Sequence, residues 1–291
     1  MKCFINSVFV TFMFTCILVS TYIINHFVSG RKEVTTGKSM ASKSSVVICG
    51  LARNIDGNCQ SKMKELEEIG RRFNEYKIVI VTNNNSDNTE FILSDWANRN
   101  SRVDILKMTD DQVVFDRSNS NHPNAHDSRI QRMARLRECY LEHVKQNYGN
   151  YSYMLVVDFD VELSNIETSR DGFFKSFAKK EWSAIFINGQ GMKEFTPYDS
   201  LAYIRHGTNE PFLQHHDTRA HQLRVATKFT NTTYLQVESA FGGYGLYKIN
   251  DIGNASYLTK NDSNCEHHTF HYQIQGDKYI NLEWIGRYTA W

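Results

Sequence analysis

The sequence predicts an α/β domain built on a mostly parallel β-sheet and preceded by one apolar N-terminal helix. From residue 46 onward, short β-branched runs alternate with segments of helical spacing. These runs are almost continuously apolar, which is typical of parallel strands covered on both faces. Residues 3–28 contain no Asp, Glu, Lys or Arg, and about 20 such residues span a bilayer core as a helix.

The composition narrows the classes of function. The 291 residues, 41% of them apolar and 22% charged, are typical of a globular chain that buries a sizeable core. This balance excludes a disordered or collagen-like protein. The 33 basic side chains nearly equal the 32 acidic ones. We therefore expect no nucleic acid among the partners, since a duplex binder usually carries a basic stripe.

Residues 1–28 are predicted to form a cytoplasmic tip and a signal-anchor transmembrane helix. The apolar run is longer than the ~7–15 residues of a cleaved signal peptide, whose alternative cleavage site lies near Gly30. Lys2 precedes the run, and Arg31 and Lys32 follow it. Because basic residues flank both ends, the positive-inside rule does not give the orientation.

Glycosylation sequons favour a luminal orientation. They occur at Asn84, Asn150, Asn231, Asn254 and Asn261. We therefore expect a single-pass type II protein of the Golgi or endoplasmic reticulum membrane, with the soluble domain in the lumen. Outside the apolar run, the four cysteines Cys49, Cys59, Cys139 and Cys265 allow three pairings. Cys49 lies in an apolar strand and is expected to be a buried thiol.

The predicted elements follow in order. Residues 29–45 are small, polar and without period, so they are interpreted as a short stem. A single domain over residues 46–291 follows. Its expected strands and helices alternate at 46–49, 59–75, 77–82, 88–98, 103–108, 127–147 and 153–157, with less regular strands at 184–188 and 244–249.

Two carboxylates end the most apolar of these strands. Asp158 and Asp160 follow the run Met154–Val157, and their i, i+2 spacing places both on one side of an extended chain. Converging carboxylates repel each other and attract a hard cation such as Mg²⁺ or Mn²⁺. Because ligands of such sheets bind beyond the carboxyl ends of the strands, residues 50–58, 83–89 and 158–162 are the predicted site loops.

The order of these motifs resembles that of a GT-A-fold glycosyltransferase, a nucleotide-sugar enzyme with one Rossmann-like α/β domain. The resemblance covers roughly residues 46–285. It rests on V-V-I-C-G-L-A-R-N at 46–54, V-T-N-N-N-S-D-N-T at 81–89, D-F-D at 158–160, E-S-A-F-G-G-Y-G at 238–245 and C-E-H-H-T-F-H at 265–271. The 238–245 stretch and Y-D-S-L-A at 198–202 are also similar to fungal capsular α-mannosyltransferases.

The resemblance implies a nucleotide-sugar half at 46–162 and an acceptor half at 163–291. The nucleotide sugar would contact Ala52, Arg53, Asn54, Asn83, Asp87 and Asp158. Arg132 and Arg135, three residues apart on one helix face, would reach the diphosphate. Simple turn chemistry in the Asn-rich loop and solvated helix charge remain the alternatives. A glycan at Asn84 would block the loop, so that sequon is expected to be unused.

The resemblance also implies a catalytic acid and a late histidine ligand. Glu266 stands where such enzymes place the base, and Glu238 is the second candidate. Asp158 and Asp160 would hold the metal together with His267 or His271, which are four residues apart and share a helix face. A core or surface histidine cluster is the alternative interpretation.

Together these features predict a metal-dependent hexosyltransferase. It would use Mn²⁺ or Mg²⁺ and move a hexose from a nucleotide diphosphate sugar to a glycan or glycoprotein acceptor. One alternative is a membrane-tethered glycan-binding protein with a degenerate transferase fold. Another is a phosphatase of the haloacid-dehalogenase type, but its D-x-D-x-[TV] motif would have Glu162 at the last position and normally follows the first strand.

Overall fold

The computed structural model describes residues 19–21, 28–109, 125–163, 166–192, 196–208, 216–230, 232–258 and 265–289. Its strands are β1 (Ser45–Ala52), β2 (Glu75–Asn83), β3 (Val103–Met108), β4 (Tyr153–Asp158), β5 (Val161–Leu163), β6 (Ala184–Gln190), β7 (Ile204–Arg205), β8 (Tyr234–Ser239), β9 (Tyr244–Lys248) and β10 (Lys278–Tyr288). Its helices include α2 (Cys59–Gly70), α3 (Thr89–Arg99), α5 (Ala125–Asn147), α6 (Ile166–Ala178), α7 (His216–Phe229), α8 (Ile249–Ile252), α9 (Glu266–Gln273) and the 3₁₀ turn η2 (Ser200–Ala202).

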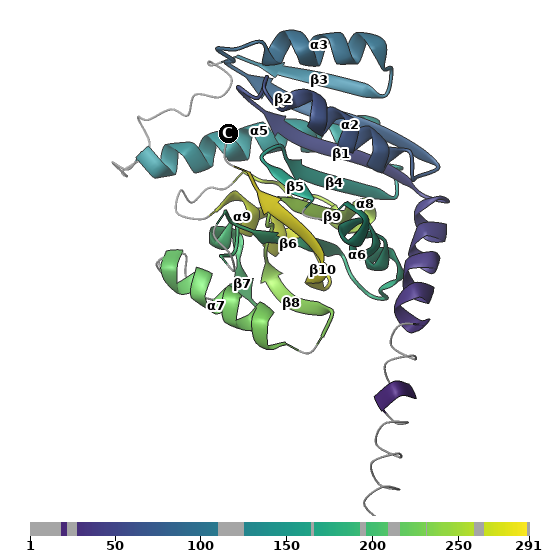
Figure 1. Cartoon of the computed structure of the whole chain (residues 1–291). Coiled ribbons are helices and arrows are strands. Elements are labelled where there is room, and N and C mark those ends of the chain that lie inside the picture. The colour runs from purple at the N-terminus through teal and green to yellow at the C-terminus, as the bar shows by residue number, and fades with distance from the viewer. Residues whose placement is uncertain are drawn as a thin grey trace, which may run out of the picture.

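The strands form one sheet in the order β3-β2-β1-β4-β9-β6-β10-β8-β7, with β5 paired to β10 (Figure 1). In the N-terminal half, β1 pairs in parallel with both β2 and β4, and β2 pairs in parallel with β3. The chain therefore leaves β1 toward one edge and returns through α5 to its other side. The carboxyl ends of β1 and β4 meet where this direction reverses, which is the usual ligand position in open α/β sheets.

The C-terminal half makes the sheet mixed. β9 is antiparallel to its neighbours β4 and β6, and β8 and β5 are antiparallel to β10. β6 and β10 are parallel to each other and keep the direction of β4. Most of the described strands thus point the same way, and the α/β class with a mostly parallel sheet is confirmed.

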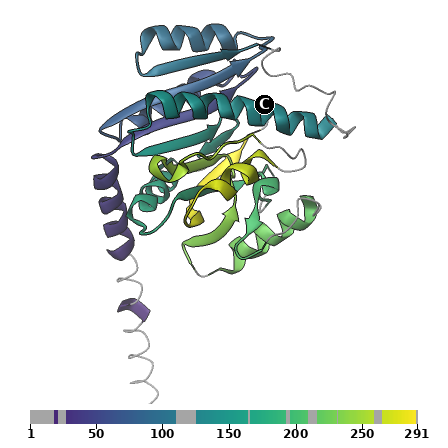
Figure 2. The same cartoon turned by 180° about the vertical axis from the view of Figure 1, so that it is seen from behind.

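Helices cover both faces of the sheet (Figures 1 and 2). Alternate residues of β1 belong to opposite cores: Val46 and Ile48 pack with α2, α3 and α6, whereas Val47 and Cys49 pack with α5, α8 and α9. These four side chains are fully buried, and each stabilises the fold by about 1.5–3 kcal/mol through its apolar area. Coverage of both faces explains the continuous apolar runs.

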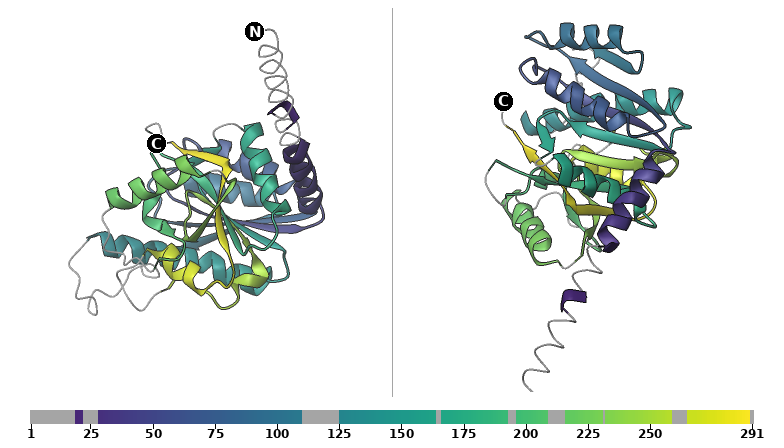
Figure 3. Two further views of the ribbon diagram at one scale, coloured as in Figure 1. Left: turned by 90° about the horizontal axis from the view of Figure 1, so that it is seen from below. Right: turned by 45° about the vertical axis from the view of Figure 1, so that its right-hand side comes forward.

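Residues 28–41, expected as an irregular stem, form a helix that lies along α6 (Figure 3). Lys38 Nζ is 2.9 Å from Asp171 Oδ1, and Ala41 is fully buried. At Gly37 an added Cβ would lie 1.8 Å from the carbonyl oxygen of Phe174, so the two helices approach closely. Packing on α6 stabilises this helix. The sequence of residues 28–41 alone has no apolar period that would reveal the contact.

The predicted signal anchor falls mostly on residues outside those that the structure describes. Within the described ranges, none of the helices combines the length and the apolarity required to cross a membrane.

The four cysteines Cys49, Cys59, Cys139 and Cys265 are free thiols, so none of the three possible pairings is formed. Cys49 is fully buried, as expected from its strand. Burial raises the pKa of Cys59 to about 11, assisted by Asp87 and Asp56. These thiols therefore pack as small apolar side chains.

Candidate functional site

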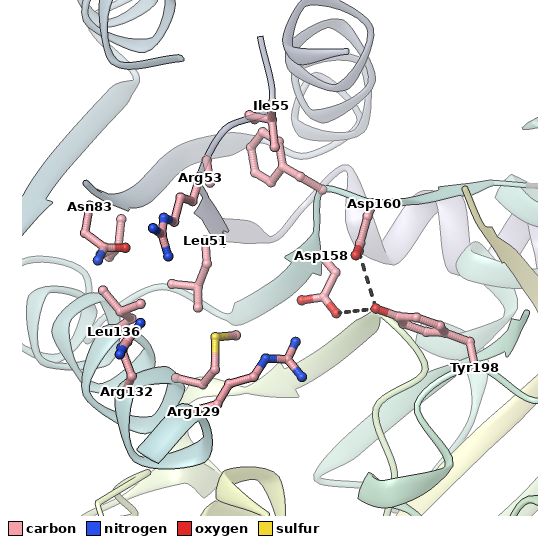
Figure 4. Close-up of a pocket in the computed structure, with 14 residues that line it drawn as sticks. Leu51, Arg53, Ile55, Asn83, Arg129, Arg132, Leu136, Asp158, Asp160 and Tyr198 are labelled. Carbon is pink, nitrogen blue, oxygen red and sulfur yellow. Dashed lines mark hydrogen bonds between the residues drawn. The ribbon is translucent and has the colours of Figure 1, made fainter. Parts of the chain in front are cut away.

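A cavity of about 400 Å³ opens at the carboxyl ends of β1, β2 and β4 (Figure 4). The strands supply its acidic and amide groups, and α5 supplies a wall with two arginines. The sequence predicted six of its lining residues: Ala52, Arg53, Asn83, Arg132, Asp158 and Asp160. Arg129 and Tyr198, which also line it, were not predicted.

The paired carboxylates converge on one side of the cavity. Asp158 is the last residue of β4, and Asp160 follows two positions later, so both project from the strand end. The hydroxyl of Tyr198 lies 3.5 Å from Asp158 Oδ2 and 3.4 Å from Asp160 Oδ1. Burial and the negative charge of Asp158 raise the pKa of Asp160 to about 6. Burial also raises the pKa of Asp158, although Arg137 opposes the rise.

Arg137 is the buried cation of the site. Only 3% of its side chain is exposed. Its Nη2 donates to Asp158 Oδ1 and its Nε donates to Glu266 Oε1, both at 3.3 Å. Its guanidinium also lies over the ring of Phe241, 5.0 Å from the centroid. Arg137 therefore joins the end of β4 to the start of α9.

Glu266 is the first residue of α9, as the sequence predicted for a helix start. It is buried, and the guanidinium of Arg137 lies between its carboxylate and that of Asp158. Its carboxylate Oε1 accepts from the Arg137 guanidinium. Glu266 thus belongs to the same polar cluster as the two aspartates without lining the cavity itself.

The structure places His267 and His271, the predicted metal ligands, in the core behind the cavity-lining residues. His271 Nδ1 lies 2.8 Å from Ser239 Oγ and its Nε2 lies 2.9 Å from Tyr247 Oη, so both ring nitrogens are engaged in the core. His267 is buried and stacks on Phe241 with ring centroids 4.1 Å apart. Neither ring lines the cavity. Among the described residues, no group of three or more His, Cys, Asp or Glu is placed to hold a metal ion.

Glu238 is also placed differently from its predicted role as a second candidate base. It lies on β8, where its Oε1 accepts a hydrogen bond from the backbone N–H of Gly207 at 2.9 Å. His206 Nδ1 is 3.0 Å from the same oxygen. Glu238 therefore fastens the β7–β8 edge of the sheet and does not line the Asp158–Asp160 cavity.

Asn54 and Asp87, predicted to contact the nucleotide sugar, shape the loops after β1 and β2 and do not line the cavity. The Asn54 side chain accepts from the Ser86 N–H at 2.8 Å, and Asp87 accepts from the Asp56 N–H at 3.1 Å. Asn54 adopts a φ of 53°, a conformation that Asn tolerates better than most residues. These bonds fix the loop after β1 against the loop after β2.

Of the two predicted diphosphate-binding arginines, Arg132 lines the cavity and Arg135 does not. The sequence offered one signal for the missed Arg137: it falls on the apolar face of α5, four residues after Met133 and three before Tyr140. A charged residue within a buried stripe indicates a buried partner. Arg129 and Tyr198 gave no comparable signal.

The amino-acid sequence was compared with protein-family models and with curated protein sequences. No protein-family model matches the chain, and a search of curated protein sequences finds no match.

Among solved structures, the chain is similar to S. aureus TarS 1-349, with 15% identity and a TM-score of 0.46 over 84% of this chain and 60% of that one. It is also similar to the mannosyltransferase PcManGT from Pyrobaculum calidifontis in complex with GDP-Man and Mn²⁺, with 10% identity and a TM-score of 0.45 over 90% and 65%. The chain thus spans less than two thirds of either protein. The weaker similarity to fungal capsular α-mannosyltransferases stays a prediction.

Proposed function

We propose that this chain is a metal-dependent glycosyltransferase of the GT-A type, which transfers a hexose from a nucleotide diphosphate sugar to a glycan or glycoprotein. One observation carries the proposal. The Asp158–Asp160 pair projects from the carboxyl end of β4, beside the β1–β4 reversal point, into a cavity of about 400 Å³. That position is where an open α/β sheet binds nucleotides.

The carboxylates have the chemistry of a divalent-cation site. Burial and mutual repulsion disfavour their ionised forms, as the raised pKa values of Asp158 and Asp160 indicate. Carboxylate oxygens are the hard ligands that Mg²⁺ and Mn²⁺ prefer. When bound, such a cation would neutralise charge on the diphosphate leaving group. Asp158 and Asp160 are the residues that would hold it.

The chain's own cations would orient the donor. Arg53, Arg129 and Arg132 line the same cavity as the two aspartates (Figure 4). An anionic diphosphate in the cavity would meet these guanidinium groups, and guanidinium forks match phosphate oxygens bidentately. Asn83 at the end of β2 adds an amide that can donate and accept hydrogen bonds.

Glu266 stays our proposed base for the acceptor hydroxyl, although its carboxylate contacts Arg137 and does not line the cavity. Its contact with Arg137 couples its position to that of Asp158. A positioned general base contributes ~10²–10⁴-fold to the rate. Glu266→Gln keeps the shape but removes the basic oxygen, so kcat should fall by at least ~10²-fold while donor binding is retained. A lowered melting temperature with unchanged kcat would assign Glu266 to structure.

Donor binding by the full-length protein tests the proposal directly. Calorimetry with Mn²⁺ and a panel that includes UDP-GlcNAc and GDP-mannose should reveal at least one binder. Asp160→Asn should weaken that binding by at least ~10-fold, since hydrogen bonds to charged groups are worth about 1.5–3 kcal/mol. Asp95→Asn removes an exposed carboxylate that pairs with Arg99 on α3 and is the matched control. The proposal would be overturned if the affinity for the donor were unchanged both in EDTA and in the Asp160→Asn variant.

We also propose that the protein is a single-pass type II protein of the Golgi or endoplasmic reticulum membrane. The support is the uncharged run at residues 3–28 and the sequons of the chain that follows it.

A further inference from the structure

Tyr198 contacts both aspartates of the cavity, although it comes from a different part of the chain. Its hydroxyl lies 3.5 Å from Asp158 Oδ2 and 3.4 Å from Asp160 Oδ1 (Figure 4). An unshared O–H···O hydrogen bond is about 2.5–3.0 Å long, and a hydroxyl has one proton to donate. The two longer distances therefore fit one proton that is shared by both carboxylates.

Contacts outside the aspartate pair fix the position of Tyr198. Its ring stacks on that of Tyr288, with the centroids 4.8 Å apart and an interplanar angle of 13°, an arrangement that aromatic pairs favour. Its backbone N–H donates to the Gly189 carbonyl at 3.0 Å, and its neighbour Pro197 forms a β-bridge with Gln190. Ring and backbone are both held, so the hydroxyl has a defined place in the cavity wall.

The end of β10 holds Asp160 as well as Tyr198. The backbone N–H of Thr289 donates to the Asp160 carbonyl at 2.9 Å, and Thr289 Oγ1 donates to the same oxygen at 3.2 Å. Tyr288 pairs with Val161 in the antiparallel β5–β10 ladder. Residues 288 and 289 therefore contact both the tyrosine and the segment that carries the second aspartate.

The backbone turns directly after Tyr198. Asp199 has a φ of 52°, in the left-handed region that few residues other than Gly adopt. Its carbonyl accepts the Ala202 N–H at 3.1 Å. Such a backbone conformation persists where the surrounding structure holds it. The chain is therefore fixed on both sides of Tyr198.

We propose that Tyr198 is a positioning residue that orients Asp158 and Asp160 so that both bind one divalent cation. This inference rests on the proposed function, which requires the cation. An ionised carboxylate has about four lone-pair sites, so each aspartate can accept from Tyr198 and still bind the ion. Two ionised carboxylates in one site repel each other, and the shared proton of Tyr198 counters that repulsion. Loss of such a hydrogen-bond partner typically lowers metal affinity about 10–100-fold.

Equilibrium binding of Mn²⁺ to the full-length protein, followed by electron paramagnetic resonance of the free ion, tests the inference without a nucleotide sugar. Tyr198→Phe keeps the ring on Tyr288 and removes the hydroxyl, so the affinity for Mn²⁺ should fall ~10-fold or more. Tyr279→Phe is the matched control, because the Tyr279 hydroxyl also donates to a carboxylate, Asp277 Oδ2, at 3.0 Å but does not line the cavity. This control should keep the wild-type affinity. An unchanged affinity in Tyr198→Phe would overturn the inference.

Two variants of Tyr288 test how the hydroxyl is held in place. Tyr288→Phe keeps a ring for Tyr198 to stack on and should bind Mn²⁺ as tightly as the wild type. Tyr288→Leu removes the stacked ring and should lower the affinity ~2–10-fold, which corresponds to about 0.5–1.5 kcal/mol for a lost aromatic pair. Melting temperatures measured alongside show that both variants are folded. Equal affinities of the two folded variants would contradict the role of Tyr288.

Binding of Mn²⁺ and of nucleotide sugars, measured separately, distinguishes this inference from the proposed function. If Asp160→Asn lowers the affinity for Mn²⁺ and Tyr198→Phe does not, the positioning role fails and the cation site stands. If Mn²⁺ binding depends on Tyr198 but no nucleotide sugar binds to the wild-type protein, the transferase proposal fails and the inference stands. If the wild-type protein binds no Mn²⁺, the inference fails whether or not a nucleotide sugar binds.

Discussion

At the scale of single residues, the site concentrates acidic groups around one buried cation. Asp158 and Glu266 both contact Arg137, and Asp160 lies two residues beyond Asp158. Burial, followed by the charges of Asp158 and Glu266, raises the pKa of Asp199 well above its ordinary value. Removing one partner from such a buried cluster leaves an uncompensated charge. The stability of the cluster therefore depends strongly on Arg137.

Arg137→Met should destabilise the protein by about 3 kcal/mol, because it leaves Asp158 and Glu266 buried without their shared guanidinium. Chemical denaturation followed by circular dichroism measures this loss. Arg132→Met on the same helix removes an exposed cation of the cavity and should change stability by less than about 0.5 kcal/mol. Equal stabilities for the two variants would contradict the role assigned to Arg137.

Asp160→Asn should stabilise the metal-free protein at neutral pH. The folded pKa of Asp160 is about 6, above the ordinary value of 3.8. The folded state therefore binds the proton more tightly than the unfolded state, and the wild type loses stability as pH rises from about 4 to 6. The variant should be more stable by roughly 1–3 kcal/mol above pH 6, with the difference vanishing below pH 4. Denaturant unfolding curves of both proteins in EDTA at pH 3.5 and pH 7 measure this difference in stability. The same difference at both pH values would contradict the prediction.

At the scale of elements, the glycine-rich turn between β8 and β9 closes the sheet beside the site. Gly243 has a φ of 96°, and an added Cβ would lie 2.5 Å from Val161 Cγ2. Its carbonyl accepts the Asp158 N–H at 2.8 Å. The structure thus shows a tight turn at residues 242–243 that supports Asp158.

Gly243→Ala should cost roughly 3 kcal/mol, because it combines a left-handed conformation with a clash in a packed region. Gly253→Ala is the matched control: its φ is 53°, but no atom lies within 4 Å of the added Cβ. That substitution should cost only about 1 kcal/mol. Thermal unfolding of both variants separates the effect of the clash from that of the backbone conformation. Equal losses of stability would show that the Val161 side chain moves aside without destabilising the protein.

The sequence predicted the elements whose signals are local. β3 at 103–108 matches its expected range, and α5 begins two residues before its expected start. α2 ends at Gly70, five residues before the predicted end, and Gly70 packs against Tyr76 too closely for a larger residue. Strong apolar runs and amphipathic spacing reveal such elements without tertiary information.

The strand order of the C-terminal half, which the sequence did not predict, depends on contacts between distant parts of the chain. β10 pairs with β5, β6 and β8, and none of these pairings leaves a periodicity in the sequence of one strand. The same holds for the site. The spacing of Asp158 and Asp160 identified them, whereas Tyr198 reaches them from about forty residues later in the chain. His271 had the spacing of a ligand, but Ser239 and Tyr247 engage both of its nitrogens.

At the scale of the whole molecule, one sheet carries the Asp158–Asp160 cavity at the ends of its N-terminal strands. β9 pairs with β4, which ends at Asp158, and also with β6, so it ties the two halves of the sheet together. The N-terminal helix lies outside this arrangement, on the α6 side of the sheet.

The full-length protein should remain in the pellet after carbonate extraction, because residues 3–28 carry no Asp, Glu, Lys or Arg. Endoglycosidase treatment should reduce its apparent mass if the soluble domain is luminal. Replacing Ile17 and Leu18 with Lys should release the protein into the supernatant, since each buried cation costs about 2.5–3.5 kcal/mol at the centre of a spanning helix. A wild-type protein recovered in the supernatant with an N-terminus near Gly30 would contradict the anchor.

The close contact of Gly37 with Phe174 has a consequence for where the proposed transferase could act. If residues 3–28 lie in the bilayer as we propose, the soluble domain is not suspended on a loose tether, because helix 28–41 docks on α6 directly after the apolar run. The domain would then stand close to the lipid surface. Its substrates would be selected by their distance from the membrane as well as by their chemistry, and a glycan held farther out would not meet the cavity.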